Sequence, residues 1–313
     1  MKELLETILR TSIFLLAIMA MGYISKTKGI LKDDEEKVLS SYVYYFAFPS
    51  LIIVNLSSIP LNYGTLLLAV GALAPLVIIT LIFTVIGYLL RMGTEKTILI
   101  ILTSIFGNLA FYGIPYVQVT FPGETPLREA TLIVSVTLIF ATVMSVLTLE
   151  YVNVQASSSI LEVLINRISR NPLIWSILIG VLISLLGLKI PSFIEYTLES
   201  LGFTSGPVAI FMLGAFLYGR GYSSIRSAVS LSFTRIALVP LLTLIISLLL
   251  GLAGTETMIV TLMNAMPVAI ILAVLSDVYD FYRETVASLI LITSLSAPIY
   301  LSIWLAALTL FFR

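Results

Sequence analysis

The chain has 313 residues, of which 59% are hydrophobic and only 11% are charged, and its mean hydropathy is +1.11. Soluble globular proteins carry about 25% charged residues, so this composition excludes a water-soluble fold. Cysteine and histidine are absent and the formal net charge is zero. We therefore expect no disulfide, no metal site, no cofactor, no enzyme activity and no nucleic-acid partner.

Long runs without Asp, Glu, Lys or Arg recur along the chain, and they predict an all-α polytopic membrane protein embedded in the lipid bilayer. A helix that spans a bilayer needs about 20 mostly apolar residues. By this criterion we expect ten transmembrane helices, at residues 4–25, 38–58, 62–90, 96–122, 128–150, 171–189, 200–219, 228–252, 256–278 and 284–311.

The positive charges predict how these spans are oriented. Eleven Lys and Arg residues lie at the ends of the odd-numbered spans and in the loops that follow them, whereas five lie on the opposite side. Cytoplasmic loops carry the excess of Lys and Arg, so the chain is predicted to lie in the cell membrane with both termini outside. Arg235 lies near the cytoplasmic end of the eighth span, and we expect its side chain to snorkel to that interface.

The most polar connection, about 151–170, divides the chain into halves 1–155 and 156–313 with five predicted spans each. Because five is odd, the second half enters the membrane from the opposite side, and any internal repeat is inverted. Short similarities recur in chain order in the two halves. They pair Arg128-Glu129 with Arg283-Glu284, Phe48-Pro49 with Gly206-Pro207, Ala74-Pro75-Leu76 with Val239-Pro240-Leu241, and Pro115 with Pro267.

The fourth and ninth spans each carry an asparagine and a proline near the middle, in Asn108-Leu-Ala-Phe-Tyr-Gly-Ile-Pro115 and Asn264-Ala-Met-Pro267. A matched pair of interrupted helices at mid-membrane is the sequence pattern of a transporter's substrate site. Each proline can begin a second half-helix, whose N-terminus offers free N–H groups and a positive dipole end to an anion. The residues predicted to bind substrate are Asn108, Tyr112, Gly113, Pro115, Asn264, Pro267 and Asn55, although helix–helix hydrogen bonding explains Asn55 about as well.

No Asp or Glu lies deep within any predicted span, although proton-driven carriers commonly use an intramembrane carboxylate or histidine as a relay. Coupling through a buried carboxylate is therefore disfavoured. Three possibilities stay open: uniport, titration of Asp277 at the cytoplasmic edge, or a cation held by neutral oxygens.

The stretch from Asn108 to Pro115 resembles the fourth helix of the auxin efflux carriers, and the stretch from Ala265 to Tyr279 resembles their ninth helix. The resemblance implies a ten-helix inverted-repeat carrier whose fourth and ninth helices cross at Pro115 and Pro267. It also implies carriage of carboxylate-bearing small molecules by an elevator-like motion. The scaffold, which also forms a homodimer in that family, would comprise the helices at about 4–58 and 171–219. The moving transport domain would comprise those at about 62–150 and 228–311.

Two other functions compete with a carrier of small organic anions. The bile-acid/sodium symporters resemble this family in fold, but their sodium sites use acidic and amide side chains beside the crossing, and this chain has no acidic residue there. An ion channel needs a continuous polar pore, and the apolar spans supply no rings of charge and no repeated carbonyl filter. We therefore predict a secondary transporter of small organic anions, with the sodium-coupled symporter as the second choice and the channel as the third.

Overall fold

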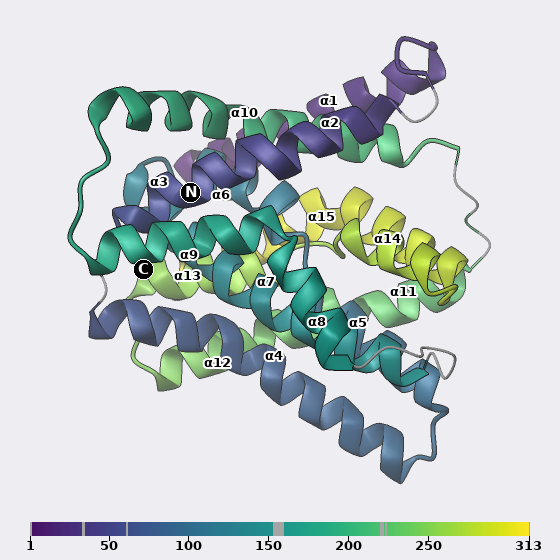
Figure 1. Ribbon diagram of the computed structural model, residues 1–313. Coiled ribbons are helices and arrows are strands. Elements are labelled where there is room, and N and C mark those ends of the chain that lie inside the picture. Colours follow the sequence, from purple (N-terminus) through teal and green to yellow (C-terminus); the bar gives the residue numbers. More distant parts are fainter. Residues whose placement is uncertain are drawn as a thin grey trace.

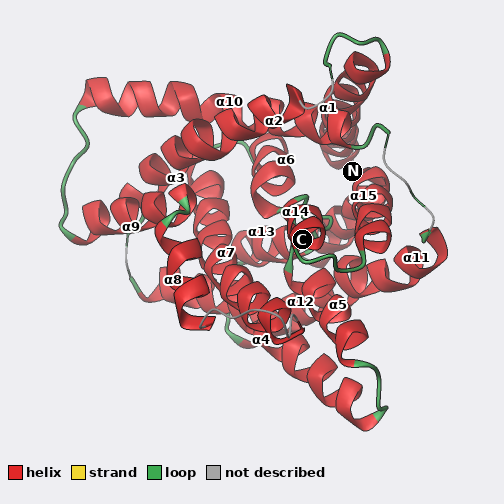
Figure 2. Ribbon diagram, turned by 45° about the vertical axis from the view of Figure 1, so that its right-hand side comes forward, coloured by secondary structure: helices red, strands yellow, loops and turns green. Residues whose placement is uncertain are grey.

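The structure is a computed structural model that describes residues 2–32, 35–60, 62–152, 160–219, 222 and 224–312. Figure 1 shows a single bundle of helices in which both chain termini lie at one end, while the turns after α1, α4, α10 and α14 lie at the opposite end. In the part of the chain that is described, the one extended pairing is an isolated bridge of two residues, so the fold is all-helical (Figure 2).

The first half of the chain contains α1 (Lys2–Thr27), α2 (Glu35–Tyr42), the π-helical turn η1 (Val43–Ala47), α3 (Phe48–Ser57), α4 (Tyr63–Leu89), α5 (Thr94–Ile105), the π-helical turn η2 (Leu109–Gly113), α6 (Ile114–Thr120) and α7 (Glu124–Val152). The second half contains α8 (Ile160–Ser169), α9 (Pro172–Leu185), α10 (Ser192–Phe216), α11 (Ile225–Phe233), the π-helical turn η3 (Thr234–Leu238), α12 (Val239–Leu249), α13 (Gly254–Asn264), α14 (Ile271–Val278) and α15 (Arg283–Phe311).

Seven of these helical segments are long and apolar enough to cross a bilayer, which confirms the polytopic all-α class. They cover Glu3–Thr27, Lys37–Ser57, Tyr63–Leu89, Glu124–Leu149, Ser192–Phe216, Ile225–Leu249 and Arg283–Phe311. The other three predicted spans correspond to the shorter apolar helix α9, to the interrupted run from α5 to α6, and to the interrupted run from α13 to α14. The ten-helix inverted repeat stays a prediction. The seventh span begins at Ser192 rather than 200, because α10 extends beyond its uncharged run and includes the acidic residues Glu195 and Glu199.

Each π-helical turn lies immediately before a proline that sits in the first turn of the next helix. A proline ring clashes with the carbonyl four residues earlier and cannot donate a hydrogen bond to it. A local π-helical turn widens the helix there, so the helix continues through the proline instead of breaking. The three pairs are η1 with Pro49, η2 with Pro115, and η3 with Pro240.

The helices pack in two groups. α1 packs along α10, and α3 packs against α9 and α10; in the other group α4 packs against α5, α7 and α12, α13 against α7 and α12, and α11 against α15. Two glycines bring α1 and α10 into backbone contact. A Cβ atom added to Gly22 would meet the carbonyl group of Phe211, and one added to Gly214 would lie 2.7 Å from the carbonyl carbon of Met19.

Candidate functional site

Two unwound segments cross in the middle of the bundle and pair through their backbones. One links α5 to η2 and the other links α13 to α14. The Asn108 N–H donates to the Pro267 carbonyl at 2.7 Å, the Ala269 N–H donates to the Phe106 carbonyl at 2.9 Å, and Gly107 faces Val268 in an antiparallel bridge. The backbone polar groups of each break are thus partly satisfied by the other break, as a low-dielectric interior requires.

The crossing lies at Gly107 and Val268, so the expectation that the helices cross at Pro115 and Pro267 is wrong for Pro115. Pro115 lies in the first turn of α6, which continues directly from η2. The π-helical turn accommodates this proline, and the break falls before it. Pro267 does lie in the crossing and contributes a carbonyl, but it does not begin a half-helix, since α14 starts at Ile271.

The second half-helices of both interrupted spans begin at the crossing. The first N–H groups of a helix have no acceptor within the helix. In the described part of the chain, no acceptor is found for the backbone N–H groups of Leu109, Ala110 and Phe111 in η2, nor for those of Ile270 and Ile271 at the start of α14. Two helix starts, with five N–H groups that lack an acceptor among the described residues, therefore lie beside the crossing.

A cavity of about 430 Å³ lies beside the crossing, and all five of these residues line it. The remaining walls come from the start of the second span, the middle of α7, the start of α9 and the first turns of α14. Its polar lining residues are Ser40, Ser41, Tyr44, Tyr45, Asn108, Thr137, Thr142, Ser145 and Asn171, and no Asp, Glu, Lys or Arg is among the lining residues. Tyr45, Ile271 and Val274 are exposed, so the cavity opens to the surface.

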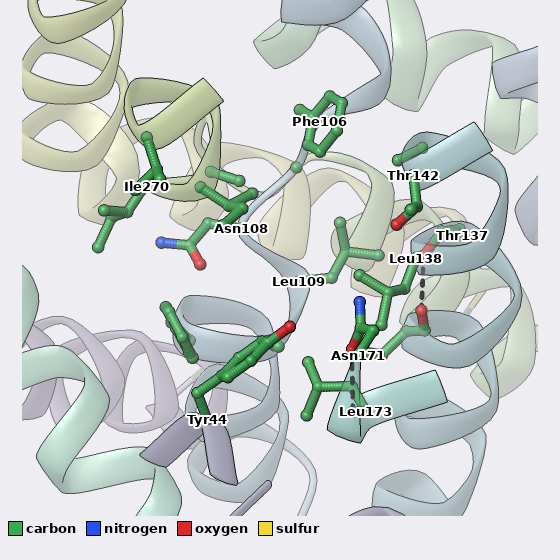
Figure 3. A pocket seen from close by; sticks show the side chains of 18 of the residues that line it. Tyr44, Phe106, Asn108, Leu109, Thr137, Leu138, Thr142, Asn171, Leu173 and Ile270 are labelled. Atoms are coloured by element: carbon green, nitrogen blue, oxygen red, sulfur yellow. Dashed lines mark hydrogen bonds between the residues drawn. The ribbon is translucent and has the colours of Figure 1, made fainter. Parts of the chain in front are cut away.

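Asn108 is held by its backbone while its side chain remains available. Its carbonyl accepts from the N–H groups of Tyr112 and Gly113, both at 3.0 Å, and its own N–H is bound to Pro267. The residue is 4% exposed, and its side-chain amide nitrogen has no hydrogen-bond partner among the described residues. Figure 3 shows the carboxamide between the side chains of Ile270 and Tyr44.

Of the seven residues predicted to bind substrate, Asn108 alone lines this cavity. Asn264 is fully buried in α13, and its amide nitrogen donates to the Ala72 carbonyl at 3.0 Å and to the Thr243 hydroxyl at 3.1 Å. These bonds tie α13 to α4 and α12, so in this conformation Asn264 joins helices.

Asn55, Tyr112 and Gly113 also lie away from the cavity. The Asn55 amide donates to the Leu51 carbonyl of its own helix at 2.8 Å. Tyr112 is fully buried, and Gly113 allows η2 to approach α13, since an added Cβ would lie 2.9 Å from the sulfur of Met263. A direct role of these residues in substrate binding stays a prediction. The side chain of Asp277, one of the possible titrating groups, lies outside the described residues.

Arg235 does not snorkel, contrary to the expectation from the sequence. The side chain is 0% exposed. Its Nε atom donates to the Met266 carbonyl and its Nη1 atom to the Ser104 carbonyl, each at 2.8 Å. Arg235 lies ten residues beyond the first residue of α11, Ile225. At about 1.5 Å per residue it lies about 15 Å along the helix from its start, a length equal to about half of the hydrocarbon thickness of a bilayer.

The guanidinium lies against the crossing itself. A Cβ atom added to Gly107 would overlap Nη2 of Arg235, which has no acceptor in the described residues. Gly107 lines the cavity and Arg235 does not, so a single glycine separates the positive charge from the cavity. The π-helical turn η3 carries Arg235, and it is anchored by Trp304 of α15, whose Nε1–H donates to the Ile236 carbonyl at 2.9 Å. Ile236 is four residues before Pro240, so Trp304 satisfies a carbonyl that the proline cannot.

Comparison with known proteins identifies the family of this chain. The membrane transport protein family matches residues 7–305. An uncharacterized transporter of Methanocaldococcus jannaschii is 26% identical over 303 residues, which cover 93% of this chain and 96% of the relative. An uncharacterized transporter of Methanothermobacter thermautotrophicus is 28% identical over 309 residues, which cover 94% and 96%. The chain therefore belongs to the membrane transport protein family, the family of the auxin efflux carriers, and is a multi-pass membrane transporter and not an enzyme.

Proposed function

We propose that the protein is a secondary transporter of small organic anions such as carboxylates, and that the anion binds at the helix crossing. The observation that carries this proposal is the convergence of five free backbone N–H groups, from Leu109 to Phe111 and from Ile270 and Ile271, on one cavity. Helix N-termini bind anions because their N–H groups point at the ligand and their dipoles favour negative charge. The amide of Asn108 adds a neutral donor without the cost of a buried lysine or arginine in the cavity.

The walls of the cavity fit an organic acid better than an inorganic anion. Apolar side chains such as Leu138, Leu173 and Val274 line it together with Thr137 and Thr142. A volume of about 430 Å³ is within the range of pockets that hold small organic ligands. The carboxylate would lie at the half-helix N-termini, and its carbon skeleton would contact the apolar wall, with the threonine hydroxyls available to a second polar group.

The position of the cavity supports an elevator-like mechanism. Tyr44 and Asn171 come from the helices of the predicted scaffold, whereas Asn108 and Ile270 come from the predicted transport domain. The site thus lies at the boundary between the two groups of helices. A displacement of the transport helices along the scaffold would carry the crossing, with its bound anion, from one side of the membrane to the other.

Two walls of the cavity, the start of the second span and the start of α9, adjoin the Lys- and Arg-rich loops that the charge distribution assigns to the cytoplasm. In our proposal this conformation is inward-facing, both termini are outside, the halves 1–155 and 156–313 are inverted repeats, and the scaffold helices form the homodimer. The breaks in both halves, each placing a half-helix N-terminus at the crossing, support the repeat.

Flux into proteoliposomes tests the proposal. The purified protein is reconstituted and offered a panel of radiolabelled monocarboxylates and dicarboxylates, together with their uncharged amides. We expect uptake of at least one carboxylate, no uptake of its amide, and loss of most of the flux in Asn108→Ala. Asn166→Ala is the matched control, because Asn166 is exposed on α8 and does not line the cavity. Absence of carboxylate flux, or unchanged flux in well-folded Asn108→Ala, would refute the site; single-channel currents would favour the channel.

A further inference from the structure

Arg235 is the largest fully buried side chain in the described part of the chain, and the anion site described above does not include it. We propose that Arg235 is a tethered internal cation: it occupies the place of a coupling cation at the crossing, so that anion binding and transport need no sodium. This inference rests on the proposed function, whose anion it helps to bind.

The guanidinium bonds to the carbonyl ends of both first half-helices. α5 ends at Ile105 and α13 ends at Asn264. Of the carbonyls that accept from Arg235, that of Ser104 lies in the last turn of α5, and that of Met266 lies two residues beyond the end of α13. The last carbonyls of a helix lack helical donors and form the negative end of its dipole. One planar guanidinium therefore bridges the two negative helix ends, while the two positive ends remain available to the substrate.

Among the described residues, no acid neutralises the charge of Arg235. No carboxylate there lies within salt-bridge distance of the guanidinium, and Nη2 has no acceptor. The hydroxyl of Tyr300 in α15 likewise has no hydrogen-bond partner in the described part of the chain. An unpaired buried cation is costly, and a bound anion on the other side of Gly107 lowers that cost. The buried charge of Arg235 therefore favours the binding of an anion to the carrier.

A sodium ion at this place would need the same carbonyl oxygens. Hard cations in proteins are held by several oxygen ligands, including backbone carbonyls, at short distances. Two such carbonyls already accept from Arg235, and no group of three or more acidic residues that could hold a metal ion occurs in the described residues. The fixed positive charge therefore replaces a diffusible one, which distinguishes this carrier from a sodium-coupled symporter.

The first test compares ligands that differ in charge. Binding of a transported carboxylate and of its uncharged amide is measured by calorimetry, in sodium chloride and in choline chloride. We expect the carboxylate Kd to be the same in both salts. Arg235→Met should raise the carboxylate Kd about fifteenfold. This factor corresponds to the loss of a unit positive charge about 10 Å from the ligand at an effective dielectric constant of about 20. The Kd of the uncharged amide should stay unchanged. Arg235→Lys should recover most of the affinity, and the exposed Arg226→Ala on α11 is the control.

Four results would overturn the proposal. One is a requirement of the wild type for sodium, which would leave the anion carrier itself intact. Another is an equal loss of carboxylate and amide binding in Arg235→Met, which would mean that Arg235 only supports the fold.

The third comes from an assay without substrate. Guanidinium chloride at low millimolar concentration should raise the Tm of Arg235→Ala but not of the wild type or Arg226→Ala. An unchanged Tm of Arg235→Ala would contradict the proposal. This assay still decides if no carboxylate binds and the proposed function fails. Should Arg235→Ala not fold, folding of Arg235→Lys but not of Arg235→Met would support a need for the charge, and the reverse would overturn it.

Discussion

Replacing Asn108 by aspartate changes the charge of the site with almost no change in shape. The Asn108 backbone is fixed by its bonds to Pro267, Tyr112 and Gly113, none of which involves the side chain. A carboxylate there would lie about 4–6 Å from a bound anion. At an effective dielectric constant of about 20, the repulsion is about 3–4 kcal/mol, which weakens anion binding about 100- to 1000-fold. We expect Asn108→Asp to bind the transported carboxylate at least about 100-fold more weakly than the wild type.

Calorimetry and flux measured at several pH values check this prediction. Binding should recover as the pH is lowered, because the introduced carboxyl takes up a proton and no longer repels the ligand. Asn171→Asp is the matched control. Asn171 lines the same cavity, but its side-chain oxygen caps α9 by accepting from the Leu173 N–H at 3.0 Å, and aspartate is an equally good cap. We expect a much smaller loss there. An unchanged carboxylate Kd in folded Asn108→Asp would refute the anion site, and a gain of affinity for cations would point to the opposite substrate charge.

Three further predictions concern the stability of the carrier and are measured by thermal and denaturant unfolding in detergent. Gly107→Ala should lower the unfolding free energy by about 1–3 kcal/mol, since the new methyl overlaps the guanidinium at the crossing, whereas Gly93→Ala, with nothing within 4 Å, should be nearly neutral. Asn264→Leu should cost about 1–3 kcal/mol, because it removes two buried hydrogen bonds, to the Ala72 carbonyl and the Thr243 hydroxyl; wild-type stability would contradict this. Gly22→Ala and Gly214→Ala should each cost about 1–3 kcal/mol, and the double variant less than their sum, because both separate the same helix pair. Strict additivity would show that the two contacts are independent.

The sequence predicts which two spans are interrupted, but not where. The prolines draw attention to Pro115, yet the chain breaks before it, at Gly107. A proline in an apolar helix can lie within a continuous α-helix, as Pro75, Pro207 and Pro298 do, or follow a π-helical turn, or lie in a break, and the choice depends on tertiary partners. In η3 one such partner is visible: Trp304, distant in sequence, donates to the carbonyl that Pro240 leaves free. No local pattern contains this information.

The sequence places Arg235 at the membrane interface, because an uncharged stretch long enough to span the bilayer follows it. An arginine beside such a run is usually interfacial. The helix, however, begins at Ile225 and carries Arg235 to its middle, so counting residues from the helix start would have found it. Asn264 shows the opposite difficulty. Its place before the break of the ninth span follows from the sequence, but the direction of its side chain, toward Ala72 and Thr243, depends on how α13 packs against α4 and α12.

The pairing of the two unwound segments separates charge recognition from shape recognition. The bonds that join Asn108 to Pro267 and Ala269 to Phe106 involve backbone atoms alone, and so do the free donors at the two half-helix starts. Substitution of the wall residues Leu138, Thr142 or Leu173 does not alter them. Such a carrier can change the size and polarity of its cargo through side-chain replacements while it keeps its preference for a negative charge. Under the function that we propose, the crossing would be a constant receptor for the ionic group, and the side chains of the wall would select the carbon skeleton.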